Sequence, residues 1–323
     1  MQLDSLFHGR LRSITILETP AGAPHPTLIF GERGNEPTDK PKFETLKKGA
    51  NLMLITVNGL VTRSYPSGDH DRIIHLLTED HGRLSVMVKG GSSKQARENA
   101  ACTQMFTFGN FELYRGKGGD LYWLRGGSVL KAFYDLSGDL SRVALATYLC
   151  DLAADLTLED CDEEESEILL RMLLNSLHVI FSGSKPLPIV KSVFELRALS
   201  LMGYRPDLTA CDICKQTYPE NAYLEVLNGR LICADCQTDL NRQFGKEAQR
   251  EDSGVGRRPV VPVSSSVLAA LRYIVSAPDK KIFSFALKDA EEERGLERAT
   301  ETFLINQLEK EYDTLRFYRT VAH

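Results

Sequence analysis

The sequence predicts an α+β multidomain protein, in which a small five-stranded β-barrel precedes an all-α domain that carries an inserted four-cysteine metal site. Three observations lead to this prediction. Five short apolar segments rich in β-branched residues fall between residues 53 and 133, a helical period of apolar residues begins at residue 140, and four cysteines form two close pairs between residues 211 and 236. A chain of 323 residues is also longer than one hydrophobic core usually accommodates.

The barrel is expected over residues 53–133. Clusters of Pro, Gly, Ser and Asp separate the apolar segments, and Leu84, Val86 and Val88 alternate with their neighbours as residues of a half-buried strand do. Five strands in so short a stretch fit a small closed barrel, because closure leaves no sheet edge to protect. The expected strands are Met53–Thr62, Arg72–Thr78, Leu84–Lys89, Met105–Tyr114 and Leu121–Ala132.

The helical domain is expected in two parts, residues 134–206 and residues 263–323. Apolar residues from Leu140 onwards recur with the period of an α-helix. Residues 207–241 interrupt this domain as a zinc-ribbon-like module, and the polar, glycine-containing residues 242–262 are expected to be a linker. The expected helices cover residues 140–156, 168–181, 188–202, 264–276 and 291–316.

Residues 1–52 differ from the rest of the chain. They contain five prolines, several glycines and little periodicity, which is typical of a disordered or loosely attached N-terminal extension. Met53 stands directly before the first expected strand, so it is a candidate for the true start of the protein.

The strongest chemical signal is the pair of motifs Cys211-Asp-Ile-Cys214 and Cys233-Ala-Asp-Cys236, which 18 residues separate. Each motif places two sulfur atoms on one tight turn, and two such turns complete a tetrahedron around zinc with bonds of about 2.3 Å. An Asn228-Gly229 hairpin signal lies between the motifs. Four cysteine ligands leave no position for water, so the sequence predicts one structural zinc ion per chain. Redox-active pairs and incidental buried cysteines are the alternatives.

The charge distribution permits a local DNA-binding face although the formal net charge is −5. Residues 53–133 contain ten Lys and Arg against seven Asp and Glu, whereas residues 134–206 contain six against twelve. A mildly basic module beside an acidic one can still bind an anionic polymer. The candidate DNA-binding cations are Arg63, Arg72, Arg83, Lys89, Lys94, Arg97, Arg115, Lys117 and Arg125.

Aromatic residues accompany these cations, and small barrels bind single strands with a basic groove and aromatic platforms. Tyr65, Tyr114, Tyr122 and Trp123 are candidate platforms. The alternative is that the aromatic residues belong to the hydrophobic core and that the cations are solvated surface residues. For three phenylalanines within one expected strand, a position in the core is the better interpretation. The flexible basic loop from Lys89 to Arg97 is the most suggestive segment. The three phenylalanines are Phe106, Phe108 and Phe111.

Catalytic motifs are absent from the sequence. It contains neither a phosphate-binding glycine loop followed by Lys-Ser/Thr nor a nucleophile elbow. A hydrolase built on Asp69, His70 and His75 is a minor alternative, because His75 lies in an apolar strand and is better explained as a core histidine. The protein is therefore expected not to be an enzyme. No apolar run approaches the ~18 residues of a membrane span and no secretion signal is visible, so a cytoplasmic location is expected.

Several further motifs occur in a fixed order along the chain. A barrel, helices and a cysteine module follow one another in the same order. The motifs are Gly59–Ser64, Asp71–Thr78, His81–Ser85 and Val88–Gly90 in the expected barrel, and Phe194–Arg197, Leu201–Pro206 and Cys211–Cys214 in the later part.

These motifs resemble the bacterial DNA repair protein family RecO, from about residue 53 to about residue 240. The resemblance implies an oligonucleotide/oligosaccharide-binding (OB) barrel, then a helical domain interrupted by a zinc knot. It also implies a non-enzymatic mediator of homologous recombination, associated with the nucleoid, that binds single- and double-stranded DNA and anneals complementary strands. Its partners would be RecR, single-strand-binding protein and, indirectly, the RecA recombinase. Residues 1–52 have no counterpart in the family.

The resemblance also places the contact with the acidic tail of single-strand-binding protein in the helical domain, where Lys191, Arg197 and Arg205 look like exposed cations. Two functions of other classes remain alternatives. One is a protein-interaction adaptor whose barrel does not bind DNA, and the other is a zinc-ribbon transcription or translation factor.

Overall fold

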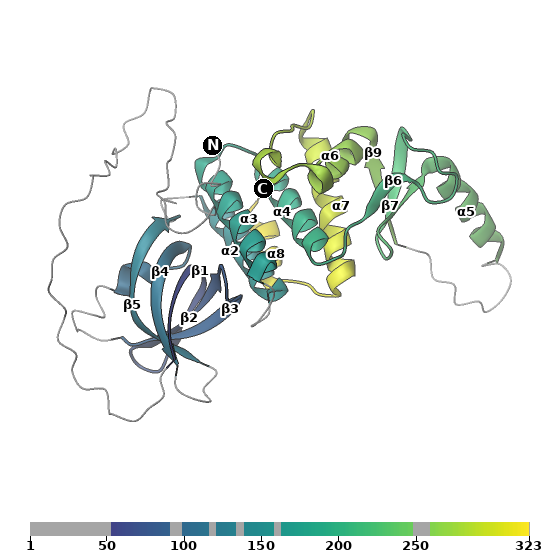
Figure 1. Ribbon diagram of the computed structural model, residues 1–323. Coiled ribbons are helices and arrows are strands. Elements are labelled where there is room, and N and C mark those ends of the chain that lie inside the picture. The colour runs from purple at the N-terminus through teal and green to yellow at the C-terminus, as the bar shows by residue number, and fades with distance from the viewer. Residues whose placement is uncertain are drawn as a thin grey trace, which may run out of the picture.

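The computed structural model describes residues 53–90, 99–115, 121–133, 139–157, 163–247 and 259–322 (Figure 1). The expected N-terminal extension, residues 1–52, lies outside the described residues. A β-barrel stands at one end of the molecule and a small cysteine-containing sheet at the other, with helices between them (Figure 1). No helix in the described ranges is long and apolar enough to cross a lipid bilayer.

The N-terminal part is a closed five-stranded barrel with the strand order β1-β2-β3-β5-β4. Its pairs are antiparallel, except that β3 and β5 run parallel. Each of the five predicted segments forms a strand, and β3 alternates buried with half-buried residues as expected, whereas β1 continues five residues past its predicted end at Thr62. They are β1 (Met53–Ser67), β2 (Asp71–Thr78), β3 (Arg83–Val88), β4 (Thr107–Arg115) and β5 (Tyr122–Ala132).

The barrel interior is filled by apolar side chains from all five strands, among them Val57, Ile74, Val86, Leu113 and Leu124. Three phenylalanines were interpreted as core residues, and burial confirms that interpretation. Their exposed fractions are 5%, 2% and 0% for Phe106, Phe108 and Phe111, respectively.

The helical domain packs around a second, larger core that includes Tyr148, Phe194, Leu271 and Phe303. One expected helix, residues 291–316, was wrong in its extent, because the structure divides it in two at Glu309. That residue adopts a left-handed conformation with φ of 48°. The helices are α2 (Leu140–Leu156), α3 (Glu163–Ser182), α4 (Leu187–Leu201), α6 (Ser265–Ser276), α7 (Ala290–Leu308) and α8 (Asp313–Val321), with the short 3-10 helix η2 (Asp279–Lys281) after α6.

The cysteine-containing sheet has the strand order β6-β8-β7-β9. Its hairpin turns at Asn228-Gly229, as predicted, with Gly229 at φ of 61°. The expected linker, residues 242–262, was too long, because a helix continues through its first residues and the strand β9 begins within it. The elements are β6 (Asp207–Cys211), β7 (Asn221–Glu225), β8 (Arg230–Cys233), α5 (Ala234–Glu247) and β9 (Val260–Ser264).

Strand β9 joins this sheet to the helical domain. It pairs with β7 over five residues, and Ser264 at its end accepts a hydrogen bond from the Val267 amide as the cap of α6. Val261 and Val263 alternate into the core shared with the helices. This alternation in a short segment explains why residues near 260 form a strand and not a linker.

The barrel is fixed to the helical domain by polar contacts and by a shared core. Leu60 and Leu77 of the barrel belong to the same apolar cluster as the helices. The Ser166 hydroxyl of α3 donates a hydrogen bond to the Thr78 carbonyl of β2 at 2.7 Å. Because that bond is buried, it favours one orientation of the barrel against α3.

Candidate metal centre and nucleic-acid interface

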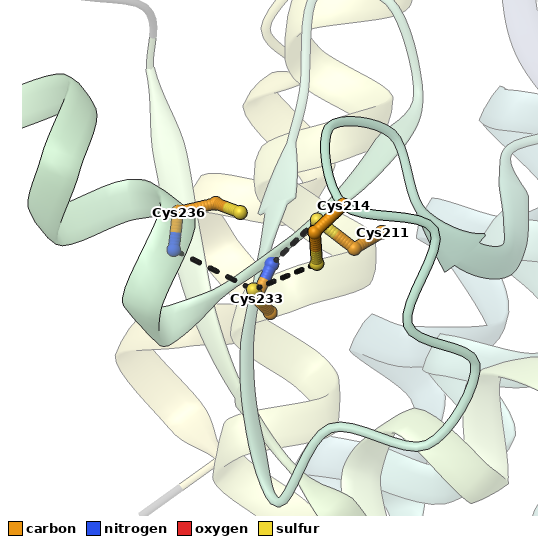
Figure 2. Close-up of side chains that lie close together, drawn as sticks. All are labelled: Cys211, Cys214, Cys233 and Cys236. Atoms are coloured by element: carbon orange, nitrogen blue, oxygen red, sulfur yellow. Dashed lines mark hydrogen bonds between the residues drawn. The ribbon is translucent and has the colours of Figure 1, made fainter.

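Four cysteines meet at one edge of the small sheet (Figure 2). Cys211 ends β6, Cys214 lies in the turn that follows, Cys233 ends β8 and Cys236 lies in the first turn of α5. Their four Sγ atoms all lie within 4.8 Å of one another, and those of Cys214 and Cys233 are 3.6 Å apart. The parallel pairing of β6 with β8 places the two Cys-x-x-Cys turns side by side.

Backbone amides face these sulfur atoms. The Cys233 amide donates to Sγ of Cys211 at 3.3 Å, and the Cys236 amide donates to Sγ of Cys233 at 3.5 Å. Burial alone would raise the pKa of Cys211, but amide donors from Cys233, Cys214 and Ile213 lower it to about 6. Burial followed by the neighbouring thiols raises the pKa of Cys236. The backbone thus favours a thiolate at Cys211 before any cation is bound.

The arrangement fits a tetrahedral metal ion. Four thiolates at bonds of about 2.3 Å would stand about 3.8 Å from one another. The described sulfur atoms span a comparable range, so only small side-chain movements would close a tetrahedron. All four donors are sulfur, which suits a closed structural site in which no coordination position remains for a substrate.

Arg272 of α6 connects this module to the helical domain. Its guanidinium group donates to the carbonyl oxygens of Leu208, Thr209 and Thr217 at 2.7, 3.1 and 2.6 Å. These carbonyls flank the first cysteine pair on both sides. The same guanidinium group lies 5.3 Å from the centre of the Tyr218 ring. Sequence reasoning missed Arg272, because its three acceptors are between 55 and 64 residues away along the chain.

Two of the predicted DNA-binding cations lie at the junction with the helical domain. Nε of Arg63 is 2.6 Å from Oδ1 of Asp151 in α2, and Arg83 donates to the Ala154 carbonyl at 2.9 Å. The Asp151 hydrogen bond is the largest cause of the raised pKa of Arg63. Both side chains therefore have intramolecular partners, and their role in DNA binding stays a prediction.

Other predicted cations gather where β3, β4 and β5 meet. Nζ of Lys89 lies 5.3 Å from the centre of the Trp123 ring, and the guanidinium carbon of Arg115 lies 4.7 Å from that of Tyr122. Arg125 is 3.6 Å from Glu112. Arg72, at the start of β2, donates to the Ser64 hydroxyl at 2.7 Å. Lys94, Arg97 and Lys117 lie outside the described residues.

A continuous row of apolar side chains winds once around the outer surface of the barrel, beginning and ending on β1. Each member pairs with the next on the neighbouring strand. None belongs to the barrel core, and Leu54 and Tyr65 at its two ends are 56% and 40% exposed. We call this set the exterior row; in order it consists of Leu54, Tyr114, Trp123, Met87, Ile73 and Tyr65.

The surface beside the exterior row is polar. Two residues away from the row, on β1 to β4, Thr56 pairs with Glu112, and His75 pairs with both Ser85 and Arg63. A barrel exterior that faces only water is expected to be polar throughout, so the apolar row is the exception. The sequence contained a signal for it, since β2, β3 and β5 carry apolar residues on both faces.

The histidine of the hydrolase alternative has no catalytic partner among the described contacts. Nε2 of His75 is 2.9 Å from the Tyr65 hydroxyl, and Nδ1 is buried without a hydrogen bond. Burial, followed by the charges of Arg63 and Arg83, lowers the pKa of His75. The interpretation of His75 as a core histidine was therefore wrong, because its side chain is only half-buried and lies on the outer face of β2, opposite Arg63 and Ser85.

The expectation that Lys191 is an exposed cation was wrong. Its side chain is fully buried, and Nζ lies 2.9 Å from Glu195 and 2.8 Å from Glu301. Position 191 falls on the face of α4 that packs against α7, which the helical pattern of one element does not reveal. Arg197 is also largely covered and pairs with Asp279, whereas Arg205 is exposed as expected.

Comparison with known proteins covers most of the chain. Residues 53–133 match the family model described as "Recombination protein O N terminal", and residues 137–316 match "Recombination protein O C terminal". The DNA repair protein RecO of Acetivibrio thermocellus is 29% identical over 83% of this chain and 97% of its own length.

Two further relatives with the same name give similar results. The protein of Symbiobacterium thermophilum is 31% identical over 70% of this chain and 91% of its own length. That of Caldicellulosiruptor bescii is 26% identical over 84% of this chain and its full length. The two family models together cover the barrel, the helices and the cysteine module. This chain therefore belongs to the RecO family of DNA repair and recombination proteins.

Proposed function

We propose that this protein is a non-enzymatic recombination mediator that binds and anneals DNA. It would act in the cytoplasm, at the nucleoid, with RecR as its partner. Its role there would be to help load RecA onto strands coated by single-strand-binding protein. The exterior row is the observation that carries the DNA-binding part. The strand order of the barrel, with its one parallel pair, supports an OB-type fold.

The exterior row offers single-stranded DNA a surface on which bases stack. It contains three aromatic rings, and neighbouring strands are about 4.8 Å apart, so the path from Leu54 around the barrel to Tyr65 is about 24 Å long. Base–aromatic stacking contributes about 1–3 kcal/mol per base and tolerates any sequence, because every base has a π face. Duplex DNA hides those faces, so this row favours single strands.

Cations beside the row supply the complementary interaction with phosphates. Lys89 stands next to Trp123, and Arg115 lies at the end of β4 beyond Tyr114. Annealing brings two anionic strands together, so protein cations must screen their repulsion and release counterions. No covalent bond changes in this process, which is why it needs no acid, base or nucleophile. Lys94, Arg97 and Lys117 are proposed as further DNA contacts from the sequence alone.

We infer a zinc ion held by Cys211, Cys214, Cys233 and Cys236, one per chain. Such an ion supplies structural cross-linking of the two turns and no reaction chemistry. Arg272 and β9 would transmit that rigidity to the helical domain. Metal analysis of protein purified without chelator tests the inference, and well under one zinc per chain would refute it.

The single tryptophan of the chain provides a direct test of the DNA site, because Trp123 lies in the middle of the exterior row. Titration with a dT oligonucleotide should quench its emission as a base stacks on the ring, and a labelled oligonucleotide should show binding that falls steeply with salt. The double variant Tyr114→Ala/Tyr65→Ala should lose at least about tenfold in affinity, since each stacked base contributes about 1–3 kcal/mol. The matched control Thr56→Ala/Ser85→Ala alters the neighbouring polar row.

The outcomes separate the competing functions. Binding with unchanged tryptophan emission would remove the exterior row from the site but keep DNA binding. No binding to bare single-stranded DNA at low salt would favour the adaptor function. A strand-annealing assay, with and without single-strand-binding protein on the DNA, then tests the mediator function itself.

A further inference from the structure

We propose that the cysteine cluster contains a peroxide-reactive modification site, in which Cys214 is oxidised first and Cys233 then forms a disulfide with it. The inference uses the cluster for which a structural zinc ion is proposed above, but the reacting pair is defined by the protein alone. Oxidants of the hydroperoxide class, such as hydrogen peroxide, are the co-reactant.

Accessibility distinguishes Cys214 from the other described cysteines. Cys214 is exposed, whereas Cys211 and Cys233 are 0% and 2% exposed and Cys236 is intermediate. Cys214 lies in the turn after β6, and its neighbour Ile213 is 50% exposed. Of the four cluster residues, Cys214 is therefore the one most accessible to a small oxidant.

A resolving thiol is already in place. The Sγ atom of Cys233 lies 3.6 Å from that of Cys214, although the two residues are 19 positions apart in the chain. Figure 2 shows these two sulfur atoms facing each other across the gap between the turn and the end of β8. The disulfide would thus join the first Cys-x-x-Cys turn to the second, and not close either turn on itself.

The chemistry balances in two steps. The Cys214 thiolate attacks one peroxide oxygen and breaks the O–O bond, which gives a sulfenic acid and hydroxide. The Cys233 thiolate then attacks the sulfenic sulfur, forms the S–S bond and releases a second hydroxide. The two sulfur atoms together lose two electrons, and the two peroxide oxygens gain them. A metal ion held by these four cysteines would lose two of its ligands when the disulfide forms, which would favour its release.

Selectivity over other thiols follows from burial. Cys102 and Cys150 are 1% and 0% exposed, and burial raises the pKa of both thiols. Protonated, enclosed thiols react poorly with peroxide. These two residues provide internal controls in the same molecule.

The modification would reach the helical domain through Arg272. Its guanidinium group holds the carbonyls of Leu208 and Thr209 before the first cysteine pair and that of Thr217 after it. Rearrangement of the segment between them changes the positions of these acceptors. Oxidation would therefore loosen the contact of the cysteine module with α6 and leave the barrel, which has its own core, intact.

The test treats the full-length native protein with hydrogen peroxide and follows metal release with a colorimetric chelator while peptide mapping locates disulfides. We expect a Cys214–Cys233 disulfide to appear together with release of about one metal ion per chain, while Cys102 and Cys150 stay reduced. A map that shows a different pair, or a cluster that stays reduced while Cys102 or Cys150 is oxidised, overturns the proposal.

Two histidine variants sharpen the test, because histidine can replace cysteine as a zinc ligand but cannot form a disulfide. Cys214→His should retain metal at the peroxide dose that empties the wild type. The matched variant Cys236→His keeps the reactive pair and should release metal as the wild type does. Equal release from both variants contradicts the assignment of Cys214.

Failure of the zinc inference is distinguishable from failure of this one. Wild-type protein that contains no metal before oxidation refutes the zinc site, and its disulfide map still decides whether Cys214 and Cys233 react. Metal-loaded protein that resists peroxide overturns the modification site and keeps the zinc site.

Discussion

The barrel and the cysteine-containing sheet are both small β structures, but different interactions stabilise them. The barrel encloses a core of its own, built from residues such as Val57, Ile74 and Phe111. The four-stranded sheet turns Leu224, Leu231 and Val263 into the core of the helical domain and leaves its far edge to four cysteines. Burial of apolar side chains in its own interior stabilises the barrel. The cysteine-containing sheet requires contacts with the helical domain and, we infer, a metal ion.

This difference gives the two structures different roles: the barrel can bind a partner, and the cysteine-containing sheet has a structural role. A barrel that is stable through its interior can present an apolar row on its exterior, because the exterior is not needed for folding. The cysteine module has no comparable interior of its own, so its sulfur atoms serve structure first. Because the module depends on its cysteines, metal loss or cysteine oxidation can change its structure without unfolding the barrel.

Metal removal should have the largest effect and should act on one side of this comparison only. Structural zinc contributes an apparent binding free energy of about 10–16 kcal/mol in small zinc modules, so chelation should expose the amides of residues 207–236. Hydrogen exchange followed by mass spectrometry should show this loss, while β1 to β5 keep their protection. Loss of protection in the barrel would contradict the independence of the two structures.

Truncation of the barrel core is the reciprocal experiment. Phe111 is fully buried in the barrel interior, so Phe111→Ala should cost about 3–5 kcal/mol of the free energy of unfolding. Urea unfolding measures that cost, and metal content should remain that of the wild type. The exterior control Thr56→Ala should change stability by no more than about 0.5 kcal/mol.

Arg272→Ala tests the attachment of the cysteine module. Loss of the three hydrogen bonds to Leu208, Thr209 and Thr217 should cost about 2 kcal/mol and increase exchange in β6 more than in β1 to β5. Arg242→Ala is the control, since the ion pair that Arg242 makes with Asp239 is exposed and such pairs contribute little. An equal effect of the two substitutions would show that Arg272 does not hold the module.

The smallest expected effect is a decrease in the stability of the barrel at acidic pH. The pKa of His75 in the folded protein lies below the ordinary 6.5, so the unfolded chain binds a proton that the folded barrel disfavours. The free energy of unfolding should therefore fall as pH drops below about 6.5, and His75→Gln should remove that part of the decline. Unfolding curves of both proteins at pH 7 and pH 5 provide the measurement, and parallel declines would exclude His75 as the cause.

Local patterns predicted much of the fold. The five strands of the barrel follow from alternation within short segments, and the four candidate ligands follow from the spacing of two Cys-x-x-Cys motifs. The break at Glu309 was not predictable in this way, because glutamate is an ordinary helix residue and gives no local signal of the left-handed conformation that it adopts. The burial of Lys191 was equally hidden, since two of its three carboxylate partners, Glu297 and Glu301, come from α7.

The sequence by itself determined the candidate metal ligands and the order of the elements, because both depend on residues close together in the chain. Only the tertiary structure decided which side chains of the barrel remain available for a partner. Cross-strand register gathers Tyr65, Trp123 and the rest of the exterior row from all five strands, and docking of α2 places Asp151 against Arg63. Register and docking join residues that are distant in the chain, so no local pattern can specify them.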